Sequence, residues 1–328
     1  MTMSHALFDK VYVEKRASKD TVTGRILERL GDPLREYIDH YKDVFDAKDA
    51  YAGRSLILAH NPGKRIYEGA PVCQSFGNEH FYYSPCVMNC IYDCEYCFLK
   101  GMYPGRNICI FTDIEETFAE LEKIEKKHDA YVCASYNTDL VALEDVAGYV
   151  EKWCEKTAAD ERLTTEIRTK CSRTDIYEKL PVSERLIFAF TVSPDEIAKG
   201  YEKGTPDAAG RLKAVKAAAA AGFPVRLCFD PMIYVRNWRE IYTEMVRRAS
   251  EELRRVNVRD ISIGTFRISD QYLKNMRKKY PDSQIAQYPY IIDKGYGRYP
   301  DKVADAMEDY MKELLDSFFK DVPVFCWR

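Results

Sequence analysis

The sequence contains no apolar run of the roughly 20 residues that a membrane-spanning helix requires, although 46% of its 328 residues are hydrophobic. Its first residues, MTMSHALFDKVYVEKR, lack the apolar core of a signal peptide. The chain also lacks the strong positive charge of proteins that coat nucleic acid nonspecifically, because its formal net charge is −3. We therefore expect a cytoplasmic globular protein with no membrane contact. This charge is still compatible with a local basic groove.

Two further signals are missing. The five histidines form no i,i+4 pair, so we interpret them as structural or surface groups. No G-x-G-x-x-G follows the first predicted strand, which removes the usual sequence support for a doubly wound dinucleotide-binding sheet.

Cysteine, in contrast, is abundant, with 11 residues. In a cytoplasmic chain these are expected to be reduced thiols, some of them bound to metal. The stretch Ser84–Pro104 contains Cys86 and then a C-x3-C-x2-C triplet formed by Cys90, Cys94 and Cys97. Structural zinc normally takes four ligands, usually as two separated pairs. Three thiolates would instead hold three irons of a four-iron cluster and leave the fourth iron open for chemistry.

The order of apolar runs predicts an α/β fold. Strands are expected at 11–15, 55–59, 107–111, 130–134, 164–168, 185–192, 225–229 and 260–266, and helices at 21–45, 114–127, 141–158, 174–179, 206–221, 238–256 and 269–279. From residue 107 onward, six strands alternate with helices, which is typical of a parallel sheet covered by helical crossovers. Six units are fewer than the eight of a closed barrel. The sequence therefore predicts an open, partial TIM-like β/α barrel.

The predicted strands and helices divide the chain into three segments. Residues 1–75 are expected to form an N-terminal helical adapter packed on the barrel, residues 76–283 the barrel, and residues 284–328 a C-terminal β-hairpin and helix. The hairpin is expected within 284–300, around Asp293-Lys294-Gly295. Basic and aromatic side chains near its tip would suit a base and a phosphate of DNA, or would form an ordinary solvated loop. These side chains are Lys294, Tyr296, Arg298 and Tyr299.

The triplet, followed by Phe98 on a chain of alternating strands and helices, resembles the radical S-adenosylmethionine superfamily. The resemblance extends to the spore photoproduct lyase family, from about residue 10 to the C-terminus. The segments that carry it are VYVEKRA at 11–17, CEYCFL at 94–99, IRTK at 167–170, FTVS at 190–193, YEKGTPDAAGRLKAVKAAAAAGFPV at 201–225 and DPMIYVRNW at 230–238.

This resemblance implies a DNA repair lyase with a [4Fe-4S] cluster and S-adenosyl-L-methionine as cofactors. Family members cleave S-adenosylmethionine reductively to a 5′-deoxyadenosyl radical, which takes a hydrogen from the methylene-bridged thymine dimer of ultraviolet-damaged DNA. The bridge fragments, a thiol returns a hydrogen, and two thymines are restored. The resemblance also implies an electron donor such as flavodoxin or ferredoxin, and we expect a monomer.

Site residues carry over by position. They are Cys90, Cys94 and Cys97 as cluster ligands, Lys170, Thr191 and Ser193 at S-adenosylmethionine, Tyr96 as a catalytic tyrosine, and Arg298 with Tyr299 on the DNA-holding hairpin. The Lys170 cation would suit the methionyl carboxylate. Thr191 and Ser193 stand where the family has serine and asparagine, and their hydroxyls could preserve those hydrogen bonds.

One departure from the family concerns the returned hydrogen. The family places a hydrogen-donating cysteine where this chain has Tyr136. Cys133 lies three residues upstream, but an odd offset turns its side chain to the opposite face of a regular strand. Cys73 precedes the cluster loop without that objection. We therefore expect Cys73 to return the hydrogen, with Tyr136 relaying or shaping the site, and Cys133 is the alternative.

Two other functions are compatible with these residues. The first is a radical S-adenosylmethionine relative with a different nucleic-acid or small-molecule substrate, which the Tyr136 departure and the acidic net charge favour. The second is a zinc-dependent nucleic-acid-binding module in which Cys86 joins the triplet as fourth ligand. Cys86 lies outside the C-x3-C-x2-C frame, so we expect it not to be a ligand.

Overall fold

The structure, a computed structural model, describes residues 7–47, 53–70 and 73–327. Its contacts divide the chain into two compact units. Unit 1 takes residues up to 69, 78–91 and 103–167, and unit 2 takes 70–77, 92–102 and the chain from 168 onward. The units therefore interleave along the sequence, unlike the three successive segments expected from it. Within the described ranges, no helix combines the length and apolarity needed to cross a bilayer.

The first sheet of unit 1 is built on the N-terminal part of the chain. Its strands, from edge to edge, are β2 (Arg35–Ile38), β1 (Lys10–Glu14), β3 (Ser55–Ala59), β8 (Ile108–Phe111) and β6 (Val87–Met88). The first four are parallel, and β6 runs antiparallel to β8. All four residues of β8 are buried. This strand, which the alternation assigned to the barrel, pairs instead with β3 in the N-terminal sheet.

The long helix predicted over residues 21–45 is wrong. Helix α1 (Thr21–Arg29) is followed by Gly31 and Asp32, which have φ of 77° and 51°. The left-handed conformation and the proline that comes next cannot continue a helix. Leu34, expected on an apolar helix face, is 98% exposed. After β2 only a short helix, α2 (Lys42–Phe45), follows, so this segment is mixed α/β and not a helical adapter.

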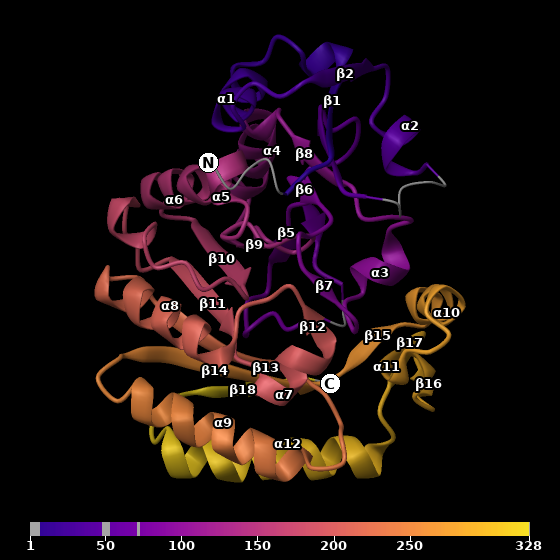
Figure 1. Ribbon diagram of the computed structural model, residues 1–328. Helices are drawn as coiled ribbons and strands as arrows, with labels where there is room; N and C mark the ends of the chain where they lie inside the picture. The colour runs from indigo at the N-terminus through magenta and orange to yellow at the C-terminus, as the bar shows by residue number, and fades with distance from the viewer. Residues whose placement is uncertain (1–6, 48–52, 71–72, 328) are drawn as a thin grey trace. The chain divides into compact units, whose positions relative to one another are not determined.

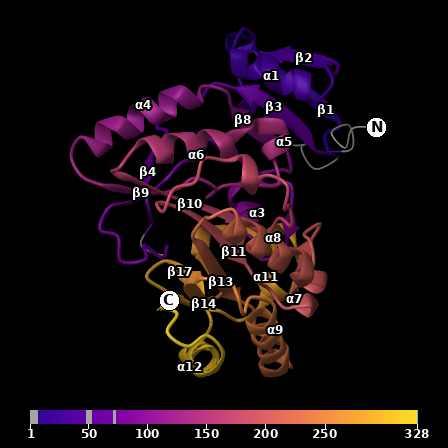
Figure 2. The same cartoon turned by 90° about the vertical axis from the view of Figure 1, so that its left-hand side faces the viewer.

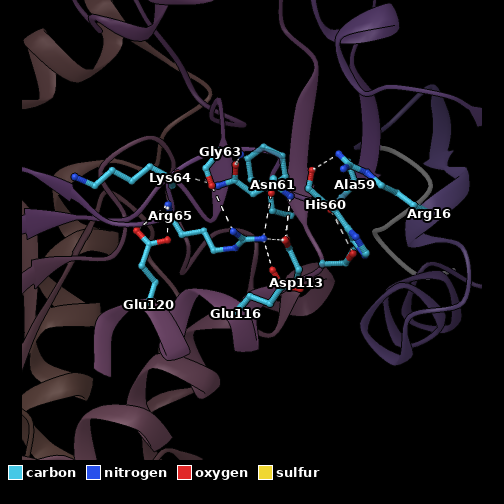
Figure 3. Close-up of polar contacts among 12 residues, drawn as sticks. Arg16, Ala59, His60, Asn61, Gly63, Lys64, Arg65, Asp113, Glu116 and Glu120 are labelled. Carbon is cyan, nitrogen blue, oxygen red and sulfur yellow. Dashed lines mark hydrogen bonds and ion pairs between the residues drawn. The ribbon is translucent and has the colours of Figure 1, made fainter. Parts of the chain in front are cut away.

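Acidic side chains hold the loop that follows β3 (Figure 3). Asp113, just before α4 (Ile114–Glu125), accepts the backbone N–H of Asn61 at 3.1 Å and pairs with the Arg65 guanidinium. Glu120 accepts the backbone N–H of Arg65 at 3.2 Å and that of the next residue at 3.1 Å. These carboxylates accept hydrogen bonds from the backbone amides of the loop. The loop after β3 is therefore bonded to the start and the middle of α4.

Unit 1 also contains a second group of strands. Their order is β10 (Leu163–Thr169), β9 (Ala130–Cys133), β5 (Phe81–Tyr83) and β4 (Tyr67–Glu68), with only β4 antiparallel to its neighbour. The last two residues of β10 belong to unit 2. Helices α4 and α6 (Tyr149–Ala159) lie side by side (Figure 2), and the ring of Phe118 meets that of Trp153 edge to face at 5.1 Å. The single helix predicted over 141–158 is interrupted, because Gly148, with φ of 68°, separates α5 (Glu144–Ala147) from α6.

In the described part of unit 2, four strands pair in parallel. Their order is β11 (Leu186–Thr191), β13 (Val225–Met232), β14 (Val258–Thr265) and β18 (Val324–Cys326), and the helices beside them are α7 (Asp195–Tyr201), α8 (Ala208–Ala220), α9 (Trp238–Glu252) and α12 (Asp301–Phe318). Figure 1 shows α9 and α12 side by side below β13 and β14. All six residues of β11 are buried, which confirms the strand that the sequence predicted to be buried on both faces. Gly222, with φ of 96°, follows α8 as predicted.

The predicted C-terminal hairpin is confirmed as a structural element of unit 2. Strands β16 (Ile291–Asp293) and β17 (Tyr296–Arg298) pair antiparallel, and β17 also pairs with β15 (Arg267–Ser269). Lys294 and Gly295 form the turn with φ of 47° and 86°, which is the left-handed pair that a tight hairpin favours. Two helices, α10 (Asp270–Lys279) and α11 (Gln284–Gln287), precede the hairpin.

Candidate functional site

The cysteine loop begins in unit 1, at Cys90. The backbone N–H of Cys90 donates to the side-chain oxygen of Asn89 at 3.0 Å. Asn89, with φ of 71°, donates its amide to the carbonyls of Gly105 at 2.9 Å and Asn107 at 3.1 Å. These bonds tie the start of the loop to the chain that leaves it, so the position of Cys90 is held locally.

The other two cysteines of the triplet lie in unit 2. Strand β7 (Asp93–Cys94) pairs antiparallel with β12 (Glu202–Lys203), which places Cys94 opposite Glu202. The N–H of Cys97 donates to the carbonyl of Cys94 at 3.1 Å, and the short helix α3 (Leu99–Met102) follows directly. A Cβ at Gly101 would meet the backbone of Tyr272. Close packing of α3 on α10 therefore fixes the end of the loop.

The two thiols of unit 2 suit a metal cluster by their chemistry. Cys94 is 6% exposed, and burial raises the pKa of its thiol to about 12, although the nearby Lys170 cation opposes the shift. Burial also raises the pKa of Cys97. Such thiols need the positive charge of bound metal to become thiolates. Among the described residues, no three His, Cys, Asp or Glu side chains converge on one metal ion, whereas a four-iron cluster takes one thiolate per iron.

Beside Cys94, a buried carboxylate gathers several partners. Glu202 is 1% exposed and accepts hydrogen bonds from the hydroxyl of Tyr96 and, at 2.6 Å, from that of Ser193. Its other oxygen pairs with the buried guanidinium of Arg211. Burial opposes ionisation of Glu202, but Lys170 and Arg211 outweigh it and hold its pKa below the ordinary value. Burial and the Glu202 charge raise the pKa of Tyr96 well above its usual range, so the phenol keeps its proton.

Three residues predicted to bind S-adenosylmethionine lie in the same unit. The ammonium of Lys170 lies 5.5 Å from the ring centroid of Tyr96. Burial opposes its charge, but Cys94 and Glu202 raise its pKa above the ordinary value. Thr191 ends β11, is 3% exposed, and accepts from Arg211 through its carbonyl at 3.2 Å. Lys170 and Ser193 are thus both close to the Tyr96–Glu202 pair.

The candidate hydrogen donors occupy both units. Cys133 is 5% exposed in unit 1, and its thiol donates to the carboxylate of Glu166 at 3.9 Å. Tyr136, also in unit 1, stacks on Tyr83 with ring centroids 4.3 Å apart. Cys73 lies in unit 2, is partly exposed, and donates its N–H to the carbonyl of Ala70 at 2.8 Å.

The four side chains predicted to contact DNA differ in exposure. Lys294 is exposed at the hairpin turn and Tyr296 is partly exposed. Arg298 pairs with Asp293 at 3.1 Å and with Asp301 at 2.6 Å. Tyr299 is only 1% exposed and accepts the backbone N–H of Tyr234 at 3.0 Å. The predicted DNA contact of Tyr299 is therefore corrected, because its side chain packs in the interior of unit 2.

Cys86 is a buried core thiol of unit 1. It is 3% exposed, contacts the carbonyl of Ala134 at 3.7 Å, and burial raises its pKa to about 11.

Sequence reasoning missed Glu202 and Arg211 as site residues. Both lie in the segment YEKGTPDAAGR, but a single glutamate and a single arginine nine residues apart carry no motif of their own. A Glu–Arg pair flanking a Gly-Thr-Pro turn was the only local signal available.

Comparisons with known proteins identify the family of this chain. The family model described as spore photoproduct lyase matches residues 78–324, about three quarters of the chain. The spore photoproduct lyase of Clostridium acetobutylicum is 23% identical over 330 residues, which cover 97% of this chain and 89% of that protein.

Solved structures agree on the fold. A spore photoproduct lyase mutant with a cysteine replaced by alanine matches with a TM-score of 0.84 at 18% identity, covering 97% of this chain and 98% of that one. A double mutant of spore photoproduct lyase with bound AdoMet and dinucleoside spore photoproduct matches with a TM-score of 0.81 at 18% identity, over the same shares. This likeness confirms the predicted fold class, an open, partial β/α barrel.

Proposed function

The chain belongs to the spore photoproduct lyase family, and we propose that it is a repair lyase that converts the methylene-bridged thymine dimer of ultraviolet-damaged DNA back to two thymines. The observation that carries this proposal is the cysteine triplet, whose Cys94 lies opposite Glu202 and next to the Lys170 cation. The similar structure with bound AdoMet and dinucleoside spore photoproduct supports the same substrate and cofactor.

The residues present fit the two cofactors. Cys90, Cys94 and Cys97 would hold a [4Fe-4S] cluster, which needs one thiolate for each of three irons. Lys170 would bind the methionyl carboxylate of S-adenosylmethionine through a charge-assisted hydrogen bond. When bound, the two cofactors together supply the radical that removes a hydrogen from the lesion. The protein contributes binding, orientation and exclusion of water.

The hydrogen that completes repair comes, in this proposal, from Cys73. A thiol gives up its hydrogen atom to a carbon radical because the S–H bond is weaker than the C–H bond that forms. The Cys133 thiol is almost fully buried and is directed to Glu166, whereas Cys73 is partly exposed. Tyr136 would then shape the site by stacking on Tyr83.

The hairpin contributes contacts to damaged DNA. Lys294 is exposed at the turn and would bind a phosphate, and the ring of Tyr296 would lie against a base. Arg298 already pairs with two aspartates, so a phosphate would have to compete for its guanidinium. A small electron-transfer protein such as flavodoxin or ferredoxin would reduce the cluster, and we expect a monomer.

The test uses protein reconstituted anaerobically with iron and sulfide. It should be brown and should consume S-adenosylmethionine and release thymine when reduced and given a synthetic methylene-bridged thymine dimer. Consumption of the cofactor without thymine release would refute the repair function and favour a different substrate. Colourless protein that binds zinc instead would refute the radical chemistry altogether.

A second experiment tests the hydrogen donor. Cys73→Ala should still consume S-adenosylmethionine but should divert the lesion radical to adducts, and Cys73→Ala with Tyr136→Cys should recover thymine release. The matched control is Cys133→Ala, which should repair normally. Normal repair by Cys73→Ala together with failure of Cys133→Ala would move the role to Cys133.

A further inference from the structure

The carboxylate of Glu202 divides its hydrogen bonds between its two oxygens. Oε1 accepts from the hydroxyls of Tyr96 and Ser193, the latter at 2.6 Å. Oε2 accepts from the guanidinium of Arg211, and the hydroxyl of Thr205 donates to the backbone carbonyl of Glu202 at 2.8 Å. All of these residues belong to unit 2. Oε2 of Glu202 is therefore held by Arg211, and Oε1 orients two hydroxyls of the candidate cofactor site.

Arg211 is built to hold this carboxylate. Its side chain is fully buried, and it also donates to the carbonyl of Thr191 at 3.2 Å, the carbonyl of Pro206 at 3.0 Å and the hydroxyl of Thr205 at 2.7 Å. A guanidinium has five N–H donors in a rigid fork and cannot accept a hydrogen bond. The side of Glu202 that faces Arg211 must therefore be an acceptor.

A hydroxyl has one proton to donate and lone pairs that accept. Because the protons of Tyr96 and Ser193 are both directed to Glu202, only their lone pairs remain for a bound molecule. We propose that Glu202 is a positioning residue that sets the hydrogen-bond polarity of the cofactor site, so that Tyr96 and Ser193 accept hydrogen bonds from the donor groups of S-adenosylmethionine. This inference rests on the proposed function, because it assumes that S-adenosylmethionine binds here.

The position of Glu202 in the chain strengthens the same conclusion. Its backbone pairs with that of Cys94 in the β7–β12 ladder, so the residue that orients Tyr96 and Ser193 also holds the strand of a predicted cluster ligand. A displacement of Glu202 would therefore move both the strand of Cys94 and the hydroxyls of Tyr96 and Ser193.

Glu202→Gln is the decisive variant, because it changes polarity with almost no change in shape. Arg211 would draw the amide oxygen to its side, which turns the amide NH2 toward Tyr96 and Ser193. Their hydroxyls would then accept from the amide and direct their protons elsewhere, into the cofactor site. S-adenosylmethionine should bind about 10-fold more weakly, as expected when donors face donors.

The measurement is equilibrium binding of S-adenosylmethionine to the reconstituted, unreduced protein, so that no turnover occurs. Ser193→Ala should also weaken binding, and adding it to Glu202→Gln should change the affinity by less than about twofold, because both changes remove the same lone pair. Glu308→Gln is the matched control. Glu308 is equally buried, and its carboxylate accepts from Thr265 and Cys326 instead.

Three results would overturn the inference. They are wild-type affinity in Glu202→Gln, full additivity of the two changes, or an equal loss of affinity in Glu308→Gln. If Glu202→Gln fails to fold, the test passes to Tyr96→Phe and Ser193→Ala, and wild-type affinity in both would overturn it. Failure of the wild-type protein to bind S-adenosylmethionine would refute the proposed function as well. If the wild-type protein binds it normally, any of the three results above refutes only the role of Glu202.

Discussion

Phe76 anchors the segment that carries Cys73, and its replacement by alanine should release that segment. The Phe76 ring lies over the Arg226 guanidinium, 3.3 Å from the ring centroid, and meets Phe325 edge to face at 5.4 Å. Phe76 has φ of 52°, a conformation that costs a side chain of this kind about 1–2 kcal/mol. The packing of the ring must offset that cost.

The expected loss follows from the burial of the ring. Replacing a buried phenylalanine by alanine costs about 3–5 kcal/mol, and the 9% exposure of Phe76 argues for the lower end. Alanine at this positive φ has the same backbone strain, so the substitution does not regain the conformational free energy that Phe76 loses there. A loss of about 3 kcal/mol lowers the ratio of docked to released segment about 100-fold.

Hydrogen–deuterium exchange measures this release directly, at the Cys73 amide that donates to Ala70. Exchange there should become up to about 100-fold faster in Phe76→Ala, and fewer thymines should be released per S-adenosylmethionine consumed. Phe318→Ala is the control, because Phe318 is 39% exposed on α12. Unchanged exchange at Cys73 in Phe76→Ala would refute the anchoring role.

Three other predictions concern stability and can be checked by urea unfolding. Asp260→Asn should lower the free energy of unfolding by about 3–5 kcal/mol, because it removes the carboxylate charge that pairs with the buried guanidinium of Arg226, which is 1% exposed; a loss below about 1 kcal/mol would contradict this. Gly148→Ala should cost about 1–2 kcal/mol, because φ there is 68° and the new Cβ would meet the Arg29 side chain; Gly200→Ala, where a Cβ meets nothing, is the control. Burial raises the pKa of Glu144 to about 7, so the folded state holds a proton that the unfolded state releases, and stability should fall as the pH rises from about 4.5 to 7. Glu144→Gln should make that fall smaller by on the order of 2 kcal/mol, and an unchanged slope between pH 5 and pH 8 would show that Glu144 is not the group responsible.

Local patterns in the sequence were enough for much of the fold. The apolar run of β11 and the glycine after α8 were predicted correctly, because burial on both faces and a left-handed helix end each require particular residue types. The Asp-Lys-Gly turn predicted the hairpin for the same reason. The cysteine spacing and the family resemblance identified the candidate cluster ligands without any coordinates.

Contacts between distant parts of the chain were beyond such patterns. Leu30 and Leu34 fit a helical period, but the Gly31-Asp32 turn ends the helix, and pairing with β1 makes the next segment a strand. Tyr299 looked like a surface residue of a basic hairpin, yet it is buried because Tyr234, 65 residues away, packs on it. Sequence spacing does not reveal which distant side chains cover one another.

The sequence by itself determined the triplet Cys90, Cys94 and Cys97 and the family, because ligand spacing is a local property of the chain. Only the tertiary structure decided what surrounds the triplet. Glu202 reaches Tyr96 across 106 residues, and Arg211 holds the far oxygen of the same carboxylate. Such a network depends on β12 pairing with β7, which no local pattern encodes, and the burial of both charges makes each partner necessary to the others.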